Sequence, residues 1–179
     1  MDKQRHEMGD TPDFEDVFLP HLDAAFNLAR WLLRNDQDAE DAVQDACLRA
    51  YKSFARFRGG DPKAWLIAIV RNVCFTMMKK TRSHGTSEPF DEELHGAPAR
   101  DDAREAFRQK ANAETLRSGL EKLPDEFREI IVLHDLEGLA YKEIAVVIGI
   151  PIGTVMSRLA RARARLRAEI TAADRQTPP

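Results

Sequence analysis

The segment that most constrains the fold is "YKEIAVVIGIPIGTVMSRLARARARLR", residues 141–167. It predicts two helices joined by a tight turn, because Ala145, Gly149 and Val155 have the spacing of a helix-turn-helix. Gly149 can adopt the positive φ that ends the first helix, and Pro151 suits the first turn of the next. We therefore expect a helix-turn-helix near the carboxyl end of the chain.

Apolar residues of this segment have the period of a helix. Four isoleucines fill the apolar places around the turn: Ile144, Ile148, Ile150 and Ile152. At about 100° per residue, the second helix has one apolar stripe: Val155, Leu159, Ala162, Leu166 and Ile170. One position of the motif that is usually apolar, late in the second helix, is occupied by Arg158, and the apolar Leu159 follows it directly in the sequence. The stripe predicts packing of this helix on the rest of its domain.

Arginines crowd the same helix, with no acidic residue among them: Arg158, Arg161, Arg163, Arg165 and Arg167. A face about 100° wide is formed by Thr154, Ser157, Arg158, Arg161 and Arg165. Arginine favours helices, so a solvated helix would also contain it, but that interpretation does not explain the missing acids. We predict that the face binds DNA, with arginines bonding to guanine or phosphate in or beside the major groove. Arg165 and Arg167 suit phosphate or packing better than base reading.

Charge and breakers divide the chain into two halves. The chain has 179 residues with 27 Lys and Arg against 30 Asp and Glu. Residues 83–105 carry 2 basic and 7 acidic residues and no sustained period, whereas the flanking segments are close to neutral. Such a composition is typical of a linker. We predict an all-α protein with two small helical domains, 13–82 and 106–172, joined by a flexible acidic linker, 83–105, with the helix-turn-helix in the second.

The first half is predicted to hold helices over about 13–34, 38–56 and 62–82, the first of which can be subdivided. An acidic face within about 60° gathers Asp38, Asp41 and Asp45, with Gln44 and Leu48 beside them. Opposite lies an apolar stripe: Val43, Cys47, Ala50, Phe54 and Phe57. Asp36 can cap this helix, and Asp45 with Arg49 forms an i,i+4 pair. Taken alone, the acidic face fits a solvated surface.

The third helix of this half combines an aromatic residue with polar and basic ones. At helical spacing lie Trp65, Ile69, Asn72 and Thr76. Its far end is basic: Arg71, Lys79, Lys80 and Arg82. Such a face is suited to binding unstacked bases and their phosphate backbone. Alternatively, Trp65 is a core residue, because a tryptophan on an apolar helix face often packs in the core. The residues alone leave both interpretations open.

Several classes of protein lack support in the sequence. No apolar run approaches the roughly 18 residues that span a bilayer, and the start lacks a signal-peptide core, so we expect a cytoplasmic protein. Cys47 and Cys74 have no CxxC partner, and we expect them to be small buried residues; the five histidines share no ligand spacing. We expect no metal, no cofactor and no enzymatic activity.

Together, these segments resemble the extracytoplasmic-function group of bacterial RNA polymerase sigma factors. The resemblance rests on "DAEDAVQDACLRAY", "FRGGDPKAWLIAIVRN", "LPDEFREIIVLHDLEGLAYKEIA" and "GTVMSRLARARARL", which occur in the family's order. It implies a promoter-specificity factor that binds core RNA polymerase, recognises the −10 and −35 elements and promotes DNA melting. It also implies a linker that threads toward the polymerase active-site cleft.

The resemblance assigns roles to residues of both domains. For docking on the polymerase clamp helices it implies Asp38, Asp41, Gln44 and Asp45. For the −10 element it implies Trp65, Arg71, Asn72 and Lys79, with a flipped base captured near Asn72. For the −35 element it implies Thr154, Ser157, Arg158, Arg161 and Arg165, while the second domain also rests on the polymerase flap.

The chain departs from the family pattern at Met156, where many relatives carry a basic residue. The long carboxyl-terminal extensions of some relatives have no counterpart here, so a separate anti-sigma factor is the expected partner for control.

Two alternative functions remain: a stand-alone helix-turn-helix regulator that binds an operator as a dimer, and a helical adaptor that binds only proteins. A closed and a loosely tethered arrangement of the two domains are both compatible with the linker.

Overall fold

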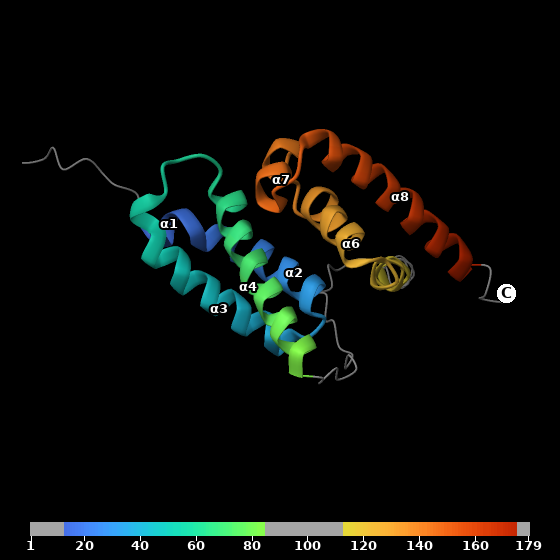
Figure 1. Cartoon of the computed structure of the whole chain (residues 1–179), viewed down its shortest axis with the longest axis horizontal. Helices are drawn as coiled ribbons and strands as arrows, with labels where there is room; N and C mark the ends of the chain where they lie inside the picture. Colours follow the sequence, from blue (N-terminus) through green and yellow to red (C-terminus); the bar gives the residue numbers. More distant parts are fainter. Residues whose placement is uncertain (1–12, 85–112, 175–179) are drawn as a thin grey trace, which may run out of the picture.

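The structure is a computed structural model, and it describes residues 13–84 and 113–174 (Figure 1). Within these ranges the regular elements are helices and none is a strand, so the prediction of an all-α protein is confirmed. The predicted linker lies outside the described residues, apart from residues 83 and 84 at the end of the third long helix.

The amino-terminal half forms a bundle of three long helices with a short helix across one end (Figure 1). Its elements are α1 (Phe14–Phe18), η1 (Leu19–His21), α2 (Leu22–Leu33), α3 (Asp36–Ser53), η2 (Phe54–Arg56) and α4 (Pro62–His84). The long helices α2, α3 and α4 each pack against the other two. We call this half the first domain.

The connection between α2 and α3 differs from the sequence-based prediction. Arg34 adopts a left-handed conformation with φ 58°, which ends α2 and leaves Asn35 extended. Asn35 Oδ1 therefore accepts a hydrogen bond from Asp38 N at 2.9 Å and caps α3. The prediction that Asp36 caps this helix is wrong, because Asp36 is already helical and forms an ion pair with Arg30 at 2.9 Å.

The buried stripe of α3 is rotated relative to the predicted one. Its fully buried residues are all alanines: Ala39, Ala42, Ala46 and Ala50. Of the predicted stripe only Ala50 is fully buried, while the larger members, Cys47 included, are half-buried. Alanines at this face let α2 and α4 approach α3 closely, which places the larger side chains at the edges of the contact. The predicted Asp45–Arg49 pair is confirmed, with Nη2 2.8 Å from Oδ2.

An aromatic cluster closes one end of the bundle and holds the start of α4. Phe18 is buried, and the centroid of its ring lies 5.1 Å from that of Trp65. Phe57 lies 5.3 Å from Trp65, and Phe54 and Phe14 complete the cluster around Phe18. Aromatic pairs at these separations add to the stability of a core. Trp65 is therefore part of the packing that positions the loop before α4.

The carboxyl-terminal half, which we call the second domain, is helical over 113–121 and then in four elements. They are α6 (Asp125–Ile131), the π-helical turn η3 (Val132–Leu136), α7 (Tyr141–Ile148) and α8 (Ile152–Asp174). The predicted stripe of α8 is confirmed, since Val155, Leu159 and Ala162 are buried and the two later members are partly buried.

The predicted helix-turn-helix is formed by α7 and α8. Gly149 has φ 76°, and its N–H donates to Ala145 O at 2.9 Å, which ends α7 as expected. Pro151 directly precedes α8 and its carbonyl accepts from Val155 N at 3.1 Å. Ile152 is 50% exposed, so its predicted place in the apolar interior of the motif is wrong.

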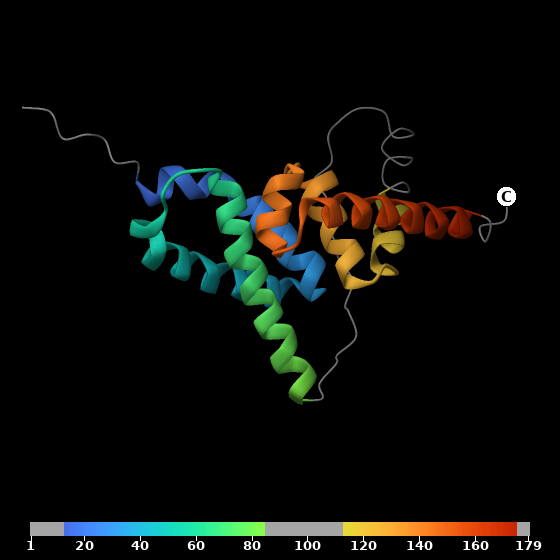
Figure 2. The ribbon, with the colours of Figure 1, turned by 45° about the horizontal axis from the view of Figure 1, so that its top comes forward.

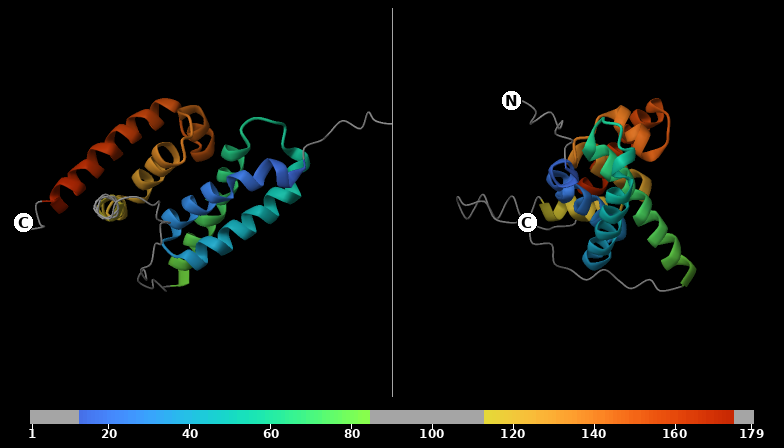
Figure 3. Two further views of the ribbon diagram at one scale, coloured as in Figure 1. Left: turned by 180° about the vertical axis from the view of Figure 1, so that it is seen from behind. Right: turned by 90° about the vertical axis from the view of Figure 1, so that its left-hand side faces the viewer.

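The two domains pack against each other (Figures 2 and 3). In the closed arrangement α7 lies on α4, and α6 lies on α2. The buried apolar residues of both domains form one continuous cluster. Figure 2 shows the last turns of α4 projecting beyond this contact, whereas its first half faces the second domain.

Candidate nucleic-acid and protein interfaces

The acidic face of α3 is accessible and includes apolar side chains. Asp38, Asp41 and Gln44 are exposed, and Asp45 is partly exposed beside Arg49. On the same side of the helix, Leu48 and Tyr51 are 57% and 66% exposed. A solvated face needs no large apolar residues, whereas acids around exposed apolar side chains fit a protein-docking surface.

One face of α4 carries most of the side chains predicted to meet the −10 element. Asn72, Thr76 and Lys79 are exposed at helical spacing on this face. Trp65 lies on it too, but its ring is partly buried in the aromatic cluster. The structure therefore brings these residues together along one helix, with Trp65 at the rim of the core.

Arg71 differs from them, because it points toward the second domain. Its Nε lies 2.5 Å from Glu129 Oε1, with side chains 17% and 2% exposed respectively. The guanidinium also lies 4.5 Å from the centroid of the Phe75 ring. Burial raises the pKa of the Glu129 carboxyl, while the hydrogen bond and charge of Arg71 act in the opposite direction. In this arrangement Arg71 is held by a protein carboxylate.

The loop before α4 places a second cation against the same domain. Gly59 and Gly60 have φ values of 86° and 101°, which glycine adopts without steric cost. Asp61 Oδ1 then accepts from Lys63 N at 2.8 Å and starts the helix. Lys63 Nζ lies 2.5 Å from Glu137 O and 3.2 Å from Glu137 Oε2. The loop over residues 58–61 thus brings Lys63, in the first turn of α4, into the contact between the domains.

The arginine face of α8 is mostly open. Ser157, Arg161 and Arg165 are exposed, and Thr154 is partly exposed. Arg161 lies over the Phe127 ring, 5.9 Å from its centroid, and Arg165 pairs with Glu169 at 3.0 Å. These side chains form a continuous polar and cationic surface on one helix.

Arg158 is turned away from that surface toward α6. Its side chain is 18% exposed, and Nη2 lies 3.4 Å from Glu126 Oε2. Among the described residues, its Nε is the buried side-chain nitrogen or oxygen atom that lacks a hydrogen-bond partner. The positive charge of Arg158 also lowers the pKa of Glu129, opposite to the effect of burial. Arg158 therefore occupies the position of the helix-turn-helix that is usually apolar, as its place in the sequence predicts.

Sequence reasoning missed the charged residues that join the two domains: Lys63, Arg128, Glu129 and Glu137. Arg128 and Glu129 are buried inside the run "LPDEFREIIVL", next to four buried apolar residues. Charges in an otherwise apolar run are the one available signal, since charged residues are seldom fully buried without partners. The signal does not say which domain supplies those partners.

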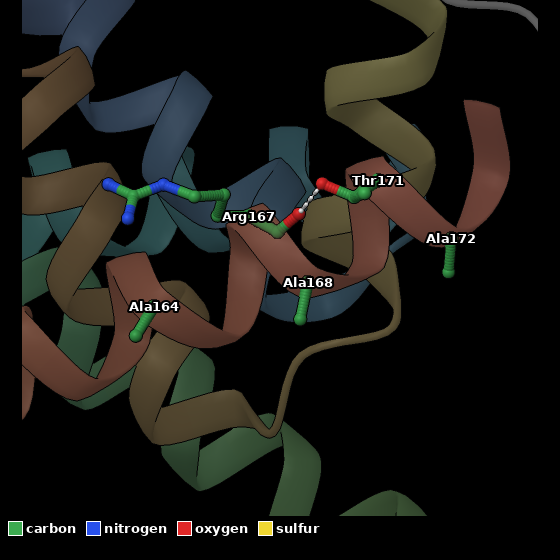
Figure 4. A pocket seen from close by; sticks show the side chains of 5 residues that line it. All are labelled: Ala164, Arg167, Ala168, Thr171 and Ala172. Carbon is green, nitrogen blue, oxygen red and sulfur yellow. Dashed lines mark hydrogen bonds between the residues drawn. The ribbon is translucent and has the colours of Figure 1, made fainter. Parts of the chain in front are cut away.

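Other kinds of site find little support in the described residues. They contain no group of three or more His, Cys, Asp or Glu that could hold a metal ion. A hollow on α8 is lined by Ala164, Arg167, Ala168, Thr171 and Ala172 (Figure 4). All five belong to one helix, and Thr171 Oγ1 donates to Arg167 O at 2.9 Å within it. The hollow offers no convergent polar groups.

Across the described ranges, no single helix is long and apolar enough to cross a membrane. One pair of helices, Tyr141–Ile148 with Ile152–Ala172, meets the length and composition required only when both are taken together, and it is bent by 100°.

Both domains match models of known families. Residues 17–84 match sigma-70 region 2, and residues 113–166 match sigma-70 region 4. The first match spans the α3 and α4 faces, and the second spans the helix-turn-helix with its arginine face. These two regions define a sigma factor of RNA polymerase.

The relatives identify the group within that class. The chain is 35% identical over 162 residues to the ECF RNA polymerase sigma factor SigM of Mycobacterium tuberculosis, covering 90% of this chain and 79% of the relative. It is 33% identical over 157 residues to the ECF sigma factor SigE of Mycolicibacterium smegmatis, covering 87% of this chain and 61% of that longer relative. The chain belongs to the ECF sigma factors of the sigma-70 family.

Solved structures agree with this assignment. The sigma factor RpoE from Bartonella quintana, in complex with the anti-sigma factor NepR, has a TM-score of 0.74 and 30% identity to this chain, over 89% of this chain and 97% of that one. CnrH, in complex with the cytosolic domain of CnrY, has a TM-score of 0.59 and 28% identity, over 89% of this chain and 88% of CnrH. Both resemble the chain across its two domains.

Proposed function

We propose that this chain directs core RNA polymerase to promoters with a −10 and a −35 element and promotes melting of the DNA there. The observation that carries the proposal is the presence of two unlike surfaces on one chain. The α3 face, with exposed acids around Leu48 and Tyr51, suits a protein partner, and the α8 face, with Ser157 and two exposed arginines, suits DNA.

On the polymerase side, Asp38, Asp41, Gln44 and Asp45 of α3 dock on the clamp helices. The exposed rings and methyl groups of Leu48 and Tyr51 add apolar area to this contact, while the carboxylates set its orientation. The second domain rests on the flap, and the acidic linker runs toward the active-site cleft.

At the −10 element, the exposed face of α4 meets a non-template strand whose bases are unstacked. Asn72 offers both a donor and an acceptor to the edge of a flipped base, and Lys79 neutralises backbone phosphate. Trp65 lies at the rim of the aromatic cluster, where a ring can stack against the base beside the melting point. Arg71 joins this surface only after it leaves Glu129.

At the −35 element, the amino end of α8 enters the major groove. Thr154 and Ser157 lie nearest the turn, Arg161 follows one turn later, and Arg165 reaches the backbone phosphates. Arg158 contributes to base recognition once its guanidinium exchanges Glu126 for DNA.

The polymerase itself binds much of the promoter DNA, so the chain needs no large positive electrostatic field of its own, in line with its net charge of −3.

Direct control comes from a separate anti-sigma factor, and the relatives solved with NepR and CnrY support this partner. The chain acts in the cytoplasm, as a binding factor without enzymatic activity of its own.

The decisive experiment is in vitro transcription with purified core polymerase on a library of promoter fragments, with and without the full chain. Specific initiation that depends on the chain supports the proposal and reveals both promoter elements. Tight binding of duplex DNA by the chain alone, with no initiation, would instead support the stand-alone regulator. Such a regulator has no use for a sigma-70 region 2, and therefore the match over residues 17–84 speaks against it.

A further inference from the structure

Two apolar side chains are exposed at the amino-terminal end of α8, the helix predicted to enter the major groove. Ile152 and Met156 are 50% and 53% exposed. They lie four residues apart, which separates them by about 6 Å along the helix axis. Within the described residues, neither belongs to the buried apolar cluster or to the partly buried residues packed against it. The packing of the second domain therefore gives no reason for an apolar side chain at either position.

The side of α8 that faces away from its own domain carries short side chains. Both α6 and α7 pack on the other side of this helix, where Val155 and Leu159 are buried. Opposite those two residues, four exposed positions follow one another at helical spacing: Gly153, Ser157, Ala160 and Ala164. No side chain on this line is longer than that of serine, so a partner can approach the backbone of α8 closely.

Longer side chains flank this line, and the two flanks differ in chemistry. At about 100° per residue, Ile152 and Met156 fall on one flank, whereas Arg161 and Arg165 fall on the other. Arginine occurs on the first flank too, but only from Arg163 onward, two turns after Met156. The first two turns of α8 thus present an apolar edge that consists of Ile152 and Met156.

The charge of the surface indicates what binds to it. No acidic residue occurs from Ile152 to Ala168, while Arg161 and Arg165 are exposed on the same helix. An anionic partner is therefore favoured over a protein surface of mixed charge. Duplex DNA is anionic, and its major groove is wide enough to admit a helix.

The chemistry of methionine then indicates which group of the DNA it meets. A thioether carries no charge and donates no hydrogen bond, so Met156 can neither neutralise a phosphate nor donate to guanine as arginine does. The apolar group that base pairs present in the major groove is the 5-methyl group of thymine. An unbranched, polarisable side chain adapts well to such a group.

We propose that Met156 contacts the 5-methyl group of a thymine in the −35 element, with Ile152 beside it, and thereby makes that thymine a determinant of promoter choice. The inference rests on the proposed function, because it requires α8 to lie in the major groove. It gives this position a base contact of a different kind from that of a basic residue. A methyl contact selects thymine, whereas a basic side chain selects guanine or phosphate.

The test removes the methyl group without altering any hydrogen-bonding group of the base. Each thymine of the −35 element is replaced in turn by deoxyuridine, and run-off transcription is measured with core polymerase and the full chain at sub-saturating holoenzyme. One replacement should reduce initiation by the wild type about fourfold, which corresponds to one methyl group removed from an apolar contact. Met156→Ala should initiate about fourfold less from the unmodified promoter and should not respond to that replacement.

Two further variants at the same position separate apolar character from side-chain length. Met156→Leu stays apolar and should keep the response to deoxyuridine, whereas Met156→Gln has a similar length, is polar and should lose it. Val146→Ala is the matched control, because Val146 is 83% exposed but lies on α7, outside the surface of α8. It should respond to deoxyuridine as the wild type does. Far-UV circular dichroism checks that every variant is folded.

The outcomes distinguish this inference from the function on which it rests. No initiation by the wild type from any promoter would contradict the proposed function, and the inference would fall with it. Wild-type initiation that requires no thymine in the −35 element, or that no deoxyuridine reduces, would overturn the role of Met156 alone. A response that persists in Met156→Ala would also overturn it. Weaker pull-down of core polymerase by Met156→Ala would instead place this side chain against the polymerase.

Discussion

Arg128 is the buried residue with the most demanding surroundings. It is fully buried and donates to Leu120 O at 3.0 Å, Leu123 O at 2.8 Å and Glu121 O at 3.2 Å. It thereby bonds to the carbonyls at the end of the helix over 113–121 and ties that helix to α6. Burial lowers the pKa of this guanidinium, which remains charged across the working range of pH.

Arg128→Met should destabilise the chain by about 3 kcal/mol, because it leaves several buried carbonyls without a donor. Urea unfolding followed by circular dichroism measures the change. Arg167→Ala, at an exposed position of α8, should change the unfolding free energy by less than about 0.5 kcal/mol. Equal effects of the two substitutions would contradict the assigned role of Arg128.

The two cysteines differ in environment, and this gives a prediction on pH. Burial raises the pKa of the Cys74 thiol to about 12 and also raises the pKa of the Cys47 thiol, but Cys47 is only half-buried whereas Cys74 is buried. The stability that the neutral Cys74 thiol contributes is fully present below its ordinary pKa of 9.0 and is lost as pH rises toward 12.

At pH 8, iodoacetamide should therefore modify Cys47 while Cys74 stays unmodified until the chain unfolds. Mass spectrometry of tryptic peptides after timed labelling distinguishes the two sites. Comparable labelling rates in the folded protein would show that α4 is less tightly packed than the structure has it.

Among the elements, the turn of the helix-turn-helix depends on backbone conformation rather than on packing. Gly149 has φ 76°, and a Cβ there would meet open space, so the cost of a side chain is one of backbone strain. Gly149→Ala should lower the free energy of unfolding by about 1 kcal/mol. Gly153→Ala, four residues on in open space within α8, should have no effect or a small stabilising one. Thermal unfolding of both variants checks the contrast.

The two DNA-facing helices should be separable by their effects on transcription. Asn72→Ala on α4 should impair open-complex formation, because a captured base loses its hydrogen-bond partner.

Arg161→Ala on α8 should weaken transcription that depends on the −35 element by about tenfold, which corresponds to the loss of one charged hydrogen bond to DNA. Both substitutions should leave binding to core polymerase intact, since neither residue belongs to the acidic face of α3 and each lies on an exposed surface proposed to face DNA.

Permanganate footprinting of the melted bases and run-off transcription on promoters with and without a −35 element measure these effects. Pull-down with core polymerase is the control for both. An equal loss in the pull-down and in open-complex formation would contradict the assignment of Asn72. Unchanged run-off transcription of Arg161→Ala from the promoter with a −35 element would contradict the assignment of Arg161.

At the scale of the whole molecule, the closed arrangement makes the two domains one unfolding unit. Their buried apolar residues form one cluster, and Arg128 and Glu129 of the second domain both bond to the first. Differential scanning calorimetry of the free chain should therefore show one transition, with a ratio of calorimetric to van't Hoff enthalpy of about 1. Two resolved transitions in the wild type would mean that the domains unfold independently.

The fold class and the helix-turn-helix could be predicted from the sequence because their signals are local. Apolar residues of α8 recur with the helical period, and Gly149 is the residue that a left-handed turn requires, so neighbours along the chain suffice. The same holds for the Asp45–Arg49 pair, which depends only on i,i+4 spacing. The cap of α3 was mispredicted by one residue, because its position depends on where Arg34 ends the helix before it.

The tertiary structure decided which charged residues are free. The sequence placed Arg71 and Arg158 with the DNA-facing side chains, since composition and helical spacing cannot register a carboxylate far along the chain. In the structure, Glu129, 58 residues from Arg71, bonds to one of them and Glu126 to the other. The physical reason is that the Arg71 pair joins the two domains and the Arg158 pair joins α8 to α6, so each depends on how separately formed helical surfaces pack, and packing joins positions that no local pattern relates.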